Sequence, residues 1–237
     1  MNFARLFRLA VAALAVLPCI PAAAALSADD KQCLACHAQE GLKKNLGKGE
    51  TLSLHVQGDE FATSVHGELG CAACHSDVAP KKHPGSGKKI GSAREYALAK
   101  VEVCSQCHED KAKLLEGSIH ATTLRQGNLW APVCTDCHGS HAVRAKAAQE
   151  PMNGISCRKC HDDIFDAYAG SMHGLARGKP GPVRAPICVD CHRAHDVSPA
   201  STGTRLRDAC LGCHAGAVGA HEKWLPNTKT HLEVVSC

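Results

Sequence analysis

The sequence has few of the side chains from which a conventional hydrophobic core is built. Only 3% of its 237 residues are aromatic. Much of the 44% hydrophobic fraction consists of Ala and Cys, which bury little apolar area per residue. A chain of this composition must gain its cohesion from disulfides, metals or bound cofactors.

Long apolar runs are also scarce, and the one candidate lies at the N-terminus. Arg5 and Arg8 flank the start of an apolar run over 9–17, which prolines break before the alanines of 22–25. This pattern predicts a secretory signal peptide over 1–25 and therefore export to the periplasm. If the segment stayed uncleaved, it would instead anchor the protein in the membrane.

Cysteine, in contrast, is abundant, with 16 residues. Fourteen of them occur in seven copies of Cys-x-x-Cys-His, the attachment signature of c-type haem. In this signature the two thiols form thioethers to the haem vinyl groups, and the adjacent His is the proximal ligand of the iron. The predicted thioether residues are Cys33, Cys36, Cys71, Cys74, Cys104, Cys107, Cys134, Cys137, Cys157, Cys160, Cys188, Cys191, Cys210 and Cys213. The predicted proximal ligands are His37, His75, His108, His138, His161, His192 and His214.

Zinc sites and disulfides are the alternatives for a cysteine-rich exported chain. Neither explains why a His follows the second cysteine of all seven pairs, so we predict seven haem c groups. The last residue, Cys237, follows a stretch similar to the one that precedes Cys71, which predicts that it opens an eighth motif. The alternative is an ordinary C-terminal cysteine.

An internal repeat identifies candidates for the distal iron ligands. The segment from Cys104 to His141 contains two motifs, a Ser-x-His between them, and a His three residues after the second motif; the segment from Cys157 to His195 repeats this order. We therefore expect two-haem units at 26–92, 93–147, 148–200 and a truncated one at 201–237, each bringing its own distal histidines. The predicted distal ligands are His66, His83, His120, His141, His173, His195 and His231, with His55 and His221 as weaker candidates.

Methionine is nearly absent after Met1, with only Met152 and Met172 remaining. Ligation by His and Met is therefore excluded as the general pattern, and bis-histidine ligation with low midpoint potentials is expected.

The predicted fold is mainly α with much irregular structure, in which short helices and long loops wrap around covalently bound haems. Short helices are expected over 92–103, 109–117 and 162–171, and no alternating strand pattern is evident. The formal charge of +4 includes two signal-peptide arginines. Because each haem adds two propionates, the basic residues are better explained as propionate partners than as a nucleic-acid surface.

These motifs resemble those of the multihaem c-type cytochromes of respiring bacteria, over essentially the whole mature chain. The resemblance implies a periplasmic electron carrier of anaerobic-type respiration, as the N-terminal part of an octahaem or larger protein. Its implied partners are a membrane quinol-oxidising or cytochrome b component and a terminal reductase or outer-membrane conduit. Membrane contact would occur through such a partner or through a further C-terminal domain.

A multihaem oxidoreductase is the rival interpretation, similar to the octahaem tetrathionate reductases and hydroxylamine oxidoreductases. Such an enzyme needs an iron with an open position, whereas seven histidine candidates match seven motifs here. No catalytic residue is predicted, and a carrier is favoured over an enzyme.

Overall fold

The computed structural model describes residues 26–85, 89–145, 155–180, 184–198 and 208–216. The predicted signal peptide, His221, His231 and Cys237 lie outside these ranges. Within the described ranges, no helix combines the length and the apolar composition needed to cross a bilayer.

Short helices dominate the described chain, which confirms the predicted fold class. The elements are α1 (Ala28–His37), β1 (Lys43–Gly47), β2 (Glu50–Ser53), α2 (Gly58–Ala62), the 3-10 helix η1 (Gly67–Leu69), α3 (Cys71–Cys74), α4 (Ala93–Ala99), α5 (Val101–Ser105), α6 (Glu109–Glu116), α7 (Ile119–Arg125), α8 (Cys134–His138), α9 (Ile155–Arg158), α10 (Asp162–Ala169), α11 (Met172–Ala176) and α12 (Cys188–His192). The three helices expected from the sequence correspond to α4 with α5, to α6 and to α10.

A β-hairpin forms where the sequence shows no alternating strand pattern. β1 and β2 pair antiparallel, with Lys43 opposite Ser53 and Gly47 opposite Glu50. The two-residue turn between them has positive φ at Lys48 (51°) and Gly49 (80°), the conformation that suits a tight hairpin. The sequence signal is weak because the strands are short and carry Lys, Asn and Glu rather than β-branched residues.

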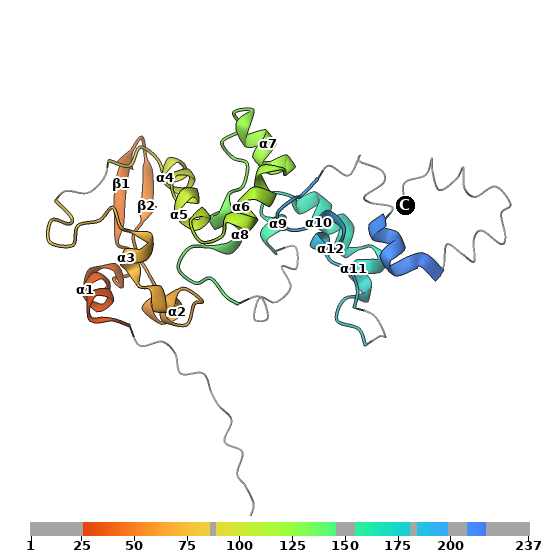
Figure 1. The fold of residues 1–237 in the computed structure, drawn as a ribbon, viewed down its shortest axis with the longest axis horizontal. Coiled ribbons are helices and arrows are strands. Elements are labelled where there is room, and N and C mark those ends of the chain that lie inside the picture. The colour runs from red at the N-terminus through yellow and green to blue at the C-terminus, as the bar shows by residue number, and fades with distance from the viewer. Residues whose placement is uncertain (1–25, 86–88, 146–154, 181–183, 199–207, 217–237) are drawn as a thin grey trace, which may run out of the picture.

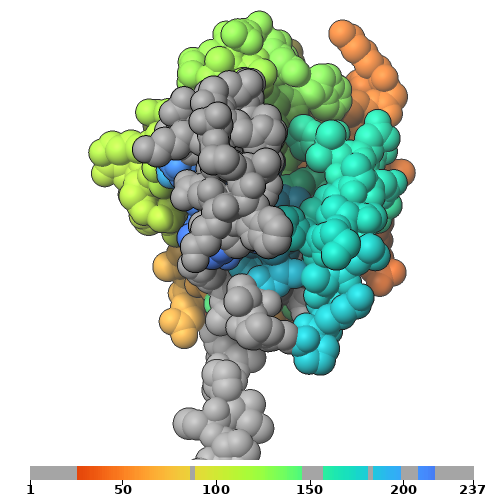
Figure 2. All heavy atoms as spheres, turned by 90° about the vertical axis from the view of Figure 1, so that its right-hand side faces the viewer, coloured from red at the N-terminus to blue at the C-terminus, as the bar shows by residue number. Residues whose placement is uncertain are grey.

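The described elements follow one another along the long axis of the molecule (Figure 1). α1 and the hairpin lie at one end, α4 to α8 in the middle, and α9 to α12 towards the other end. Seen along that axis, the green segments of the second unit project at the top and the teal segments of the third unit at the side (Figure 2). The described elements therefore form a linear array whose order in space is their order in the chain.

The protein side chains form only a small hydrophobic core. In the described part of the chain, the buried apolar residues are Phe61, Ala62, Ala131, Val133 and Ile187. Several large apolar side chains are exposed, among them Ile164 at 68% and Met172 at 83%. Five buried residues, two of them alanines, cannot organise a chain of this length, as the scarcity of aromatic residues predicts.

Candidate haem-binding sites

Each motif begins on a short helix, which sets the direction of its two thiols. α3, α8 and α12 start at the first cysteine of their motifs, and α1 ends at His37. In the third and fifth motifs, the histidine instead stands at the N-cap of the following helix, His108 before α6 and His161 before α10. A helical turn places both cysteines of a motif on neighbouring positions, as two thioethers to one porphyrin require.

An aspartate caps the N-terminus of the motif helix in the second and third repeat units. Asp136 accepts a hydrogen bond from the backbone N–H of Val133 at 2.7 Å, and Asp190 accepts one from Ile187 at the same distance. Each carboxylate thereby satisfies a donor that the first helical turn leaves free. This explains why both motifs read Cys-x-Asp-Cys-His.

Six motif histidines each face a second histidine ring. The ring centroids of these pairs are 5.9–6.3 Å apart. The pairs are His37 with His83, His75 with His141, His108 with His66, His138 with His195, His161 with His120, and His214 with His173. In every pair one ring belongs to a Cys-x-x-Cys-His motif and the other lies outside the motifs.

The separation of these rings matches two axial ligands on opposite sides of one metal ion. A histidine nitrogen lies about 2 Å from a bound transition metal. The centre of its five-membered ring lies about 1 Å farther away at ordinary bond lengths. Two axial rings should therefore have centroids about 6 Å apart, with the porphyrin plane between them. The described residues fit bis-histidine haem at six motifs.

Burial keeps several of these rings in the neutral form that binds iron. It lowers the pKa of His75 to about 4, with the Lys100 ammonium as a further cause. Burial also lowers the pKa values of His120, His138, His141 and His195. A neutral imidazole offers one nitrogen lone pair to a metal and one N–H to a hydrogen-bond acceptor.

Two proximal candidates have a hydrogen-bond partner for the second ring nitrogen. The Nδ1 atom of His37 lies 2.7 Å from the carbonyl oxygen of Leu54, and that of His75 lies 3.3 Å from the hydroxyl of Tyr96. Because a carbonyl oxygen only accepts, the Leu54 contact sets Nδ1–H in His37 and leaves Nε2 free for iron. The Tyr96 hydroxyl orients the ring of His75 and can accept from Nδ1–H when Nε2 binds iron.

The Ser-x-His pattern is the N-terminal cap of a short helix. Ser118 Oγ accepts from the N–H of Ala121 at 3.1 Å, and Ser171 Oγ accepts from Gly174 at 3.2 Å. The cap fixes the first turn, and the histidine two positions later is held in that turn. In the first unit Ser64 Oγ instead accepts from the N–H of His66 itself, at 3.3 Å, without capping a helix.

The repeat left open which motif each distal candidate faces, and five of the six ring pairs join histidines of two different predicted units. Only the ring pair of His37 and His83 lies within one predicted unit. The rings of His66 and His141 reach across the boundary between the first and second units. The other three pairs cross the following boundaries in the same way. Neighbouring units are therefore interleaved.

Backbone hydrogen bonds join the segments that carry these crossing histidines. The N–H of Val65, just before His66, donates to the carbonyl of Val143 at 2.9 Å. The N–H of Ile119, just before His120, donates to Val197 at 2.8 Å. These equivalent bonds show that successive units are joined by the same backbone contact, placed just before the crossing histidine.

Consecutive motifs also adjoin one another through their cysteines. The first thiols of two motifs interact at Cys33 with Cys71, at Cys104 with Cys134 and at Cys157 with Cys188. The second cysteine lies within electrostatic range of the next motif at Cys74 with Cys104 and Cys107, at Cys137 with Cys160, and at Cys191 with Cys210 and Cys213. Burial raises the pKa of Cys71 to about 12 and that of Cys157 to about 11. The seven motifs thus form one unbroken series.

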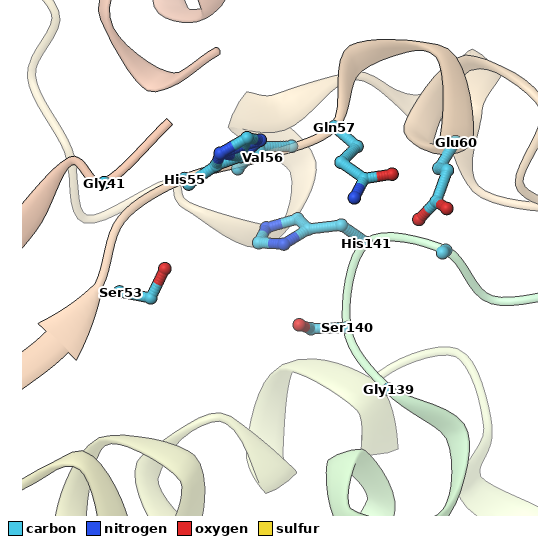
Figure 3. Close-up of a pocket in the computed structure, with 10 residues that line it drawn as sticks. Gly41, Ser53, His55, Val56, Gln57, Glu60, Gly139, Ser140 and His141 are labelled. Carbon is cyan, nitrogen blue, oxygen red and sulfur yellow. The ribbon is translucent and has the colours of Figure 1, made fainter. Parts of the chain in front are cut away.

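His192 is the exception among the motif histidines. No described ring faces it, and the predicted ligand His231 lies outside the described residues. His55, a weaker candidate, also faces no motif histidine in the described part of the chain; with His141 it lines a cavity of about 500 Å³. The ring of His141 points from its loop towards the segment of Ser53 and His55 (Figure 3).

Neither disulfides nor metal-binding clusters are found among the described residues. The fourteen motif cysteines are all free of disulfides. Within the same ranges, no group of three or more His, Cys, Asp or Glu residues is placed to hold a metal ion such as zinc.

A family model described as "Cytochrome c7 and related cytochrome c" matches residues 140–215. This stretch contains three of the seven motifs, those that begin at Cys157, Cys188 and Cys210. The match supports a multihaem c-type cytochrome with covalently bound haem and a function in electron transfer. No curated protein and no solved structure matches the chain. The comparisons therefore support this class of protein and nothing more specific.

Proposed function

We propose that this protein is a periplasmic electron relay that carries seven c-type haems in chain order, most of them with bis-histidine ligation. The observation that carries the proposal is the set of six histidine pairs, each with one motif ring and one other ring about 6 Å away. A pair of this kind saturates the iron and leaves no position for a substrate. The haems, once bound, supply the one-electron redox chemistry.

The protein's own residues determine the order and spacing of the sites. Cysteines of consecutive motifs lie close together, as the thiol–thiol hydrogen bond of Cys104 with Cys134 illustrates, so each site lies beside the next. Ligands that cross unit boundaries then attach each unit to its neighbour. Both features favour transfer along the series over reaction at a single site.

In the proposed setting, the relay accepts electrons from a membrane quinol-oxidising or cytochrome b component. It delivers them to a terminal reductase or an outer-membrane conduit in anaerobic-type respiration. The signal-peptide pattern at 1–25 supports export to the periplasm. Eight haems in a longer protein would follow if Cys237 opens a further motif.

The relay is tested on full-length holoprotein produced in a host with a c-type maturation system. We expect about seven haems per chain by pyridine haemochrome assay and six low-spin irons by electron paramagnetic resonance. Carbon monoxide should bind to at most one reduced iron per chain. High-spin spectra for most haems, or carbon monoxide binding at several of them, would contradict the proposal.

An oxidoreductase is the second candidate, and one observation favours it. His192 faces no described ring, so its iron is the candidate for an open position if neither His221 nor His231 reaches it. Turnover of nitrite, hydroxylamine or tetrathionate, lost in His192→Ala but not in His55→Ala, would establish this function instead.

A further inference from the structure

We infer that helix α4 sets the reduction potential of the haem held by His75, with Tyr96 lowering this potential and Lys100 raising it. The inference rests on the proposed function, because it requires a haem at the motif of Cys71 and Cys74. It identifies two residues outside every motif as positioning and tuning residues for one site.

The first observation is the contact between Tyr96 and the proximal ring. The Tyr96 hydroxyl lies 3.3 Å from Nδ1 of His75. When Nε2 binds iron, Nδ1 carries the ring proton, so the ring donates and the phenol oxygen accepts. Such a partner orients the ring and makes it a stronger electron donor, which stabilises ferric iron and lowers the potential.

The second observation is the position of Lys100, the C-cap residue of α4. Its Nζ donates to the carbonyl oxygen of Cys74 at 3.0 Å, directly before His75 in the chain. The ammonium lies 5.3 Å from the centre of the Tyr96 ring and pairs with Asp77 at 3.2 Å. Only 17% of the Lys100 side chain is exposed, so water screens its charge incompletely. A positive charge in this place favours the ferrous state, which has one positive charge fewer.

Tyr96 and Lys100, both in the second unit, contact the second motif of the first unit at His75 and Cys74. We call this pair of contacts the clasp. Tyr96 and Lys100 are one helical turn apart and therefore lie on the same side of α4. Ser92 caps this helix by accepting from the N–H of Glu95, which fixes its start. Among the described proximal candidates, His75 alone has a side-chain hydroxyl as its recorded Nδ1 partner; His37 uses a backbone carbonyl.

The test is a spectroelectrochemical titration of the full-length holoprotein and four single variants, one of them a control. Tyr96→Phe keeps the ring and removes the hydroxyl. It should raise one of the one-electron steps by about 30 mV, a threefold change in the reduction equilibrium, at about 59 mV per tenfold. Lys100→Met should lower the potential of the same step. Lys100→Arg keeps the charge and should leave this potential close to the wild-type value. The chain offers a matched control in Tyr168→Phe, because the only other tyrosine donates to the carbonyl of Pro186 and not to a ligand.

Haem content separates the two levels of the inference. A wild-type chain without haem at this motif would refute the proposed function itself. With haem present, an unchanged or lowered potential in Tyr96→Phe would overturn the role of Tyr96. If Tyr96→Phe failed to mature, Lys100→Met would decide: a downward shift supports the clasp, and no shift overturns it. Equal shifts in Tyr96→Phe and Tyr168→Phe would show a nonspecific effect and would also overturn the inference.

Discussion

The second and third repeat units share the same capping residues but differ in the ion pairs that support them. Both place a serine cap before the crossing histidine and an aspartate inside the second motif. Asp136 pairs with Arg94 of α4, at 2.8 Å, from a distant part of the chain. Asp190 pairs with Arg184, only six residues away, at 2.8 Å. The histidine ring pairs are thus kept while the supporting contacts vary, so these pairs, rather than one fixed set of local contacts, define the repeat.

The largest expected effect comes from removing the crossing ligand of the third unit. In His195→Ala, the iron of His138 should lose its sixth ligand, although this haem belongs to the second unit. We expect one high-spin, carbon monoxide-binding haem per chain more than in wild type, and His141→Ala should add one in the same way at His75. Visible and electron paramagnetic resonance spectra measure both.

The location of the opened haem is checked by removing thioether cysteines in the His195→Ala background. Replacing Cys134 and Cys137 by Ser should abolish the high-spin signal that His195→Ala adds, whereas replacing Cys188 and Cys191 should leave this added signal. The reverse result would show that His195 serves a haem of its own unit, and that ligands do not cross the unit boundary. His55→Ala serves as the control and should stay low-spin.

The second prediction contrasts the first unit with the later two. Its second motif has Ala73 where the others have aspartate, and Asp30 of α1 takes over by accepting from the N–H of Cys71 at 2.7 Å. This bond and those from Ser27 lower the pKa of Asp30 to about 2, and the residue is only 4% exposed. Asp30→Asn should therefore cost about 2 kcal/mol of unfolding free energy at pH 7.

The stabilisation by the Asp30 carboxylate depends on pH. Because the folded pKa lies below the ordinary value of 3.8, the stabilisation is complete above pH 3.8 and is lost as pH falls through about 2. Denaturant titrations from pH 7 to pH 2 should show the difference between wild type and Asp30→Asn shrinking. Asp136→Asn, which removes the charge from the bonds to Val133 and Arg94, should cost about 1 kcal/mol. A difference for Asp30→Asn that does not change with pH would refute the role of its charge.

The third prediction concerns the residue after the second motif of each repeat. Gly139 has φ 70° and ψ −169°, and Arg193 occupies nearly the same conformation, with φ 62° and ψ 173°. This region is essentially restricted to glycine, and another residue held there costs about 1–3 kcal/mol. Arg193→Gly should therefore stabilise the protein by about 1 kcal/mol, despite the loss of its exposed ion pair with Asp196.

Gly139→Ala should act in the opposite direction, by a similar amount. Denaturation midpoints of the two variants measured side by side test the pair. Destabilisation by Arg193→Gly would show that the arginine side chain contributes more than its backbone strain costs.

Sequence reasoning reached the features that are local in the chain. Cys-x-x-Cys-His and Ser-x-His are readable because each is completed within a few residues, by a helical turn or by a cap. The crossing of ligands was missed, because a repeat shows that His66 and His120 are equivalent but not which iron each one faces. That choice depends on tertiary bonds such as Val65 to Val143.

Single features outside the repeat gave no signal at all. Asp30 and Tyr96 act on motifs 41 and 21 residues away. Neither has a counterpart that would make it stand out in the sequence. The hairpin was overlooked for a different reason, since its turn at Lys48 and Gly49 connects strands with low β-propensity.

The smallest expected difference separates the two serine caps. Ser118 is completely buried, and Ser171 is only partly so. In Ser118→Ala, the N–H of Ala121 loses its acceptor where water cannot replace it, so we expect a loss of about 2 kcal/mol. In Ser171→Ala, water can solvate the N–H of Gly174, and the expected loss is about 1 kcal/mol. Hydrogen exchange at these two amides in the holoprotein measures the caps directly, and a larger effect at Gly174 would show that burial does not control their strength.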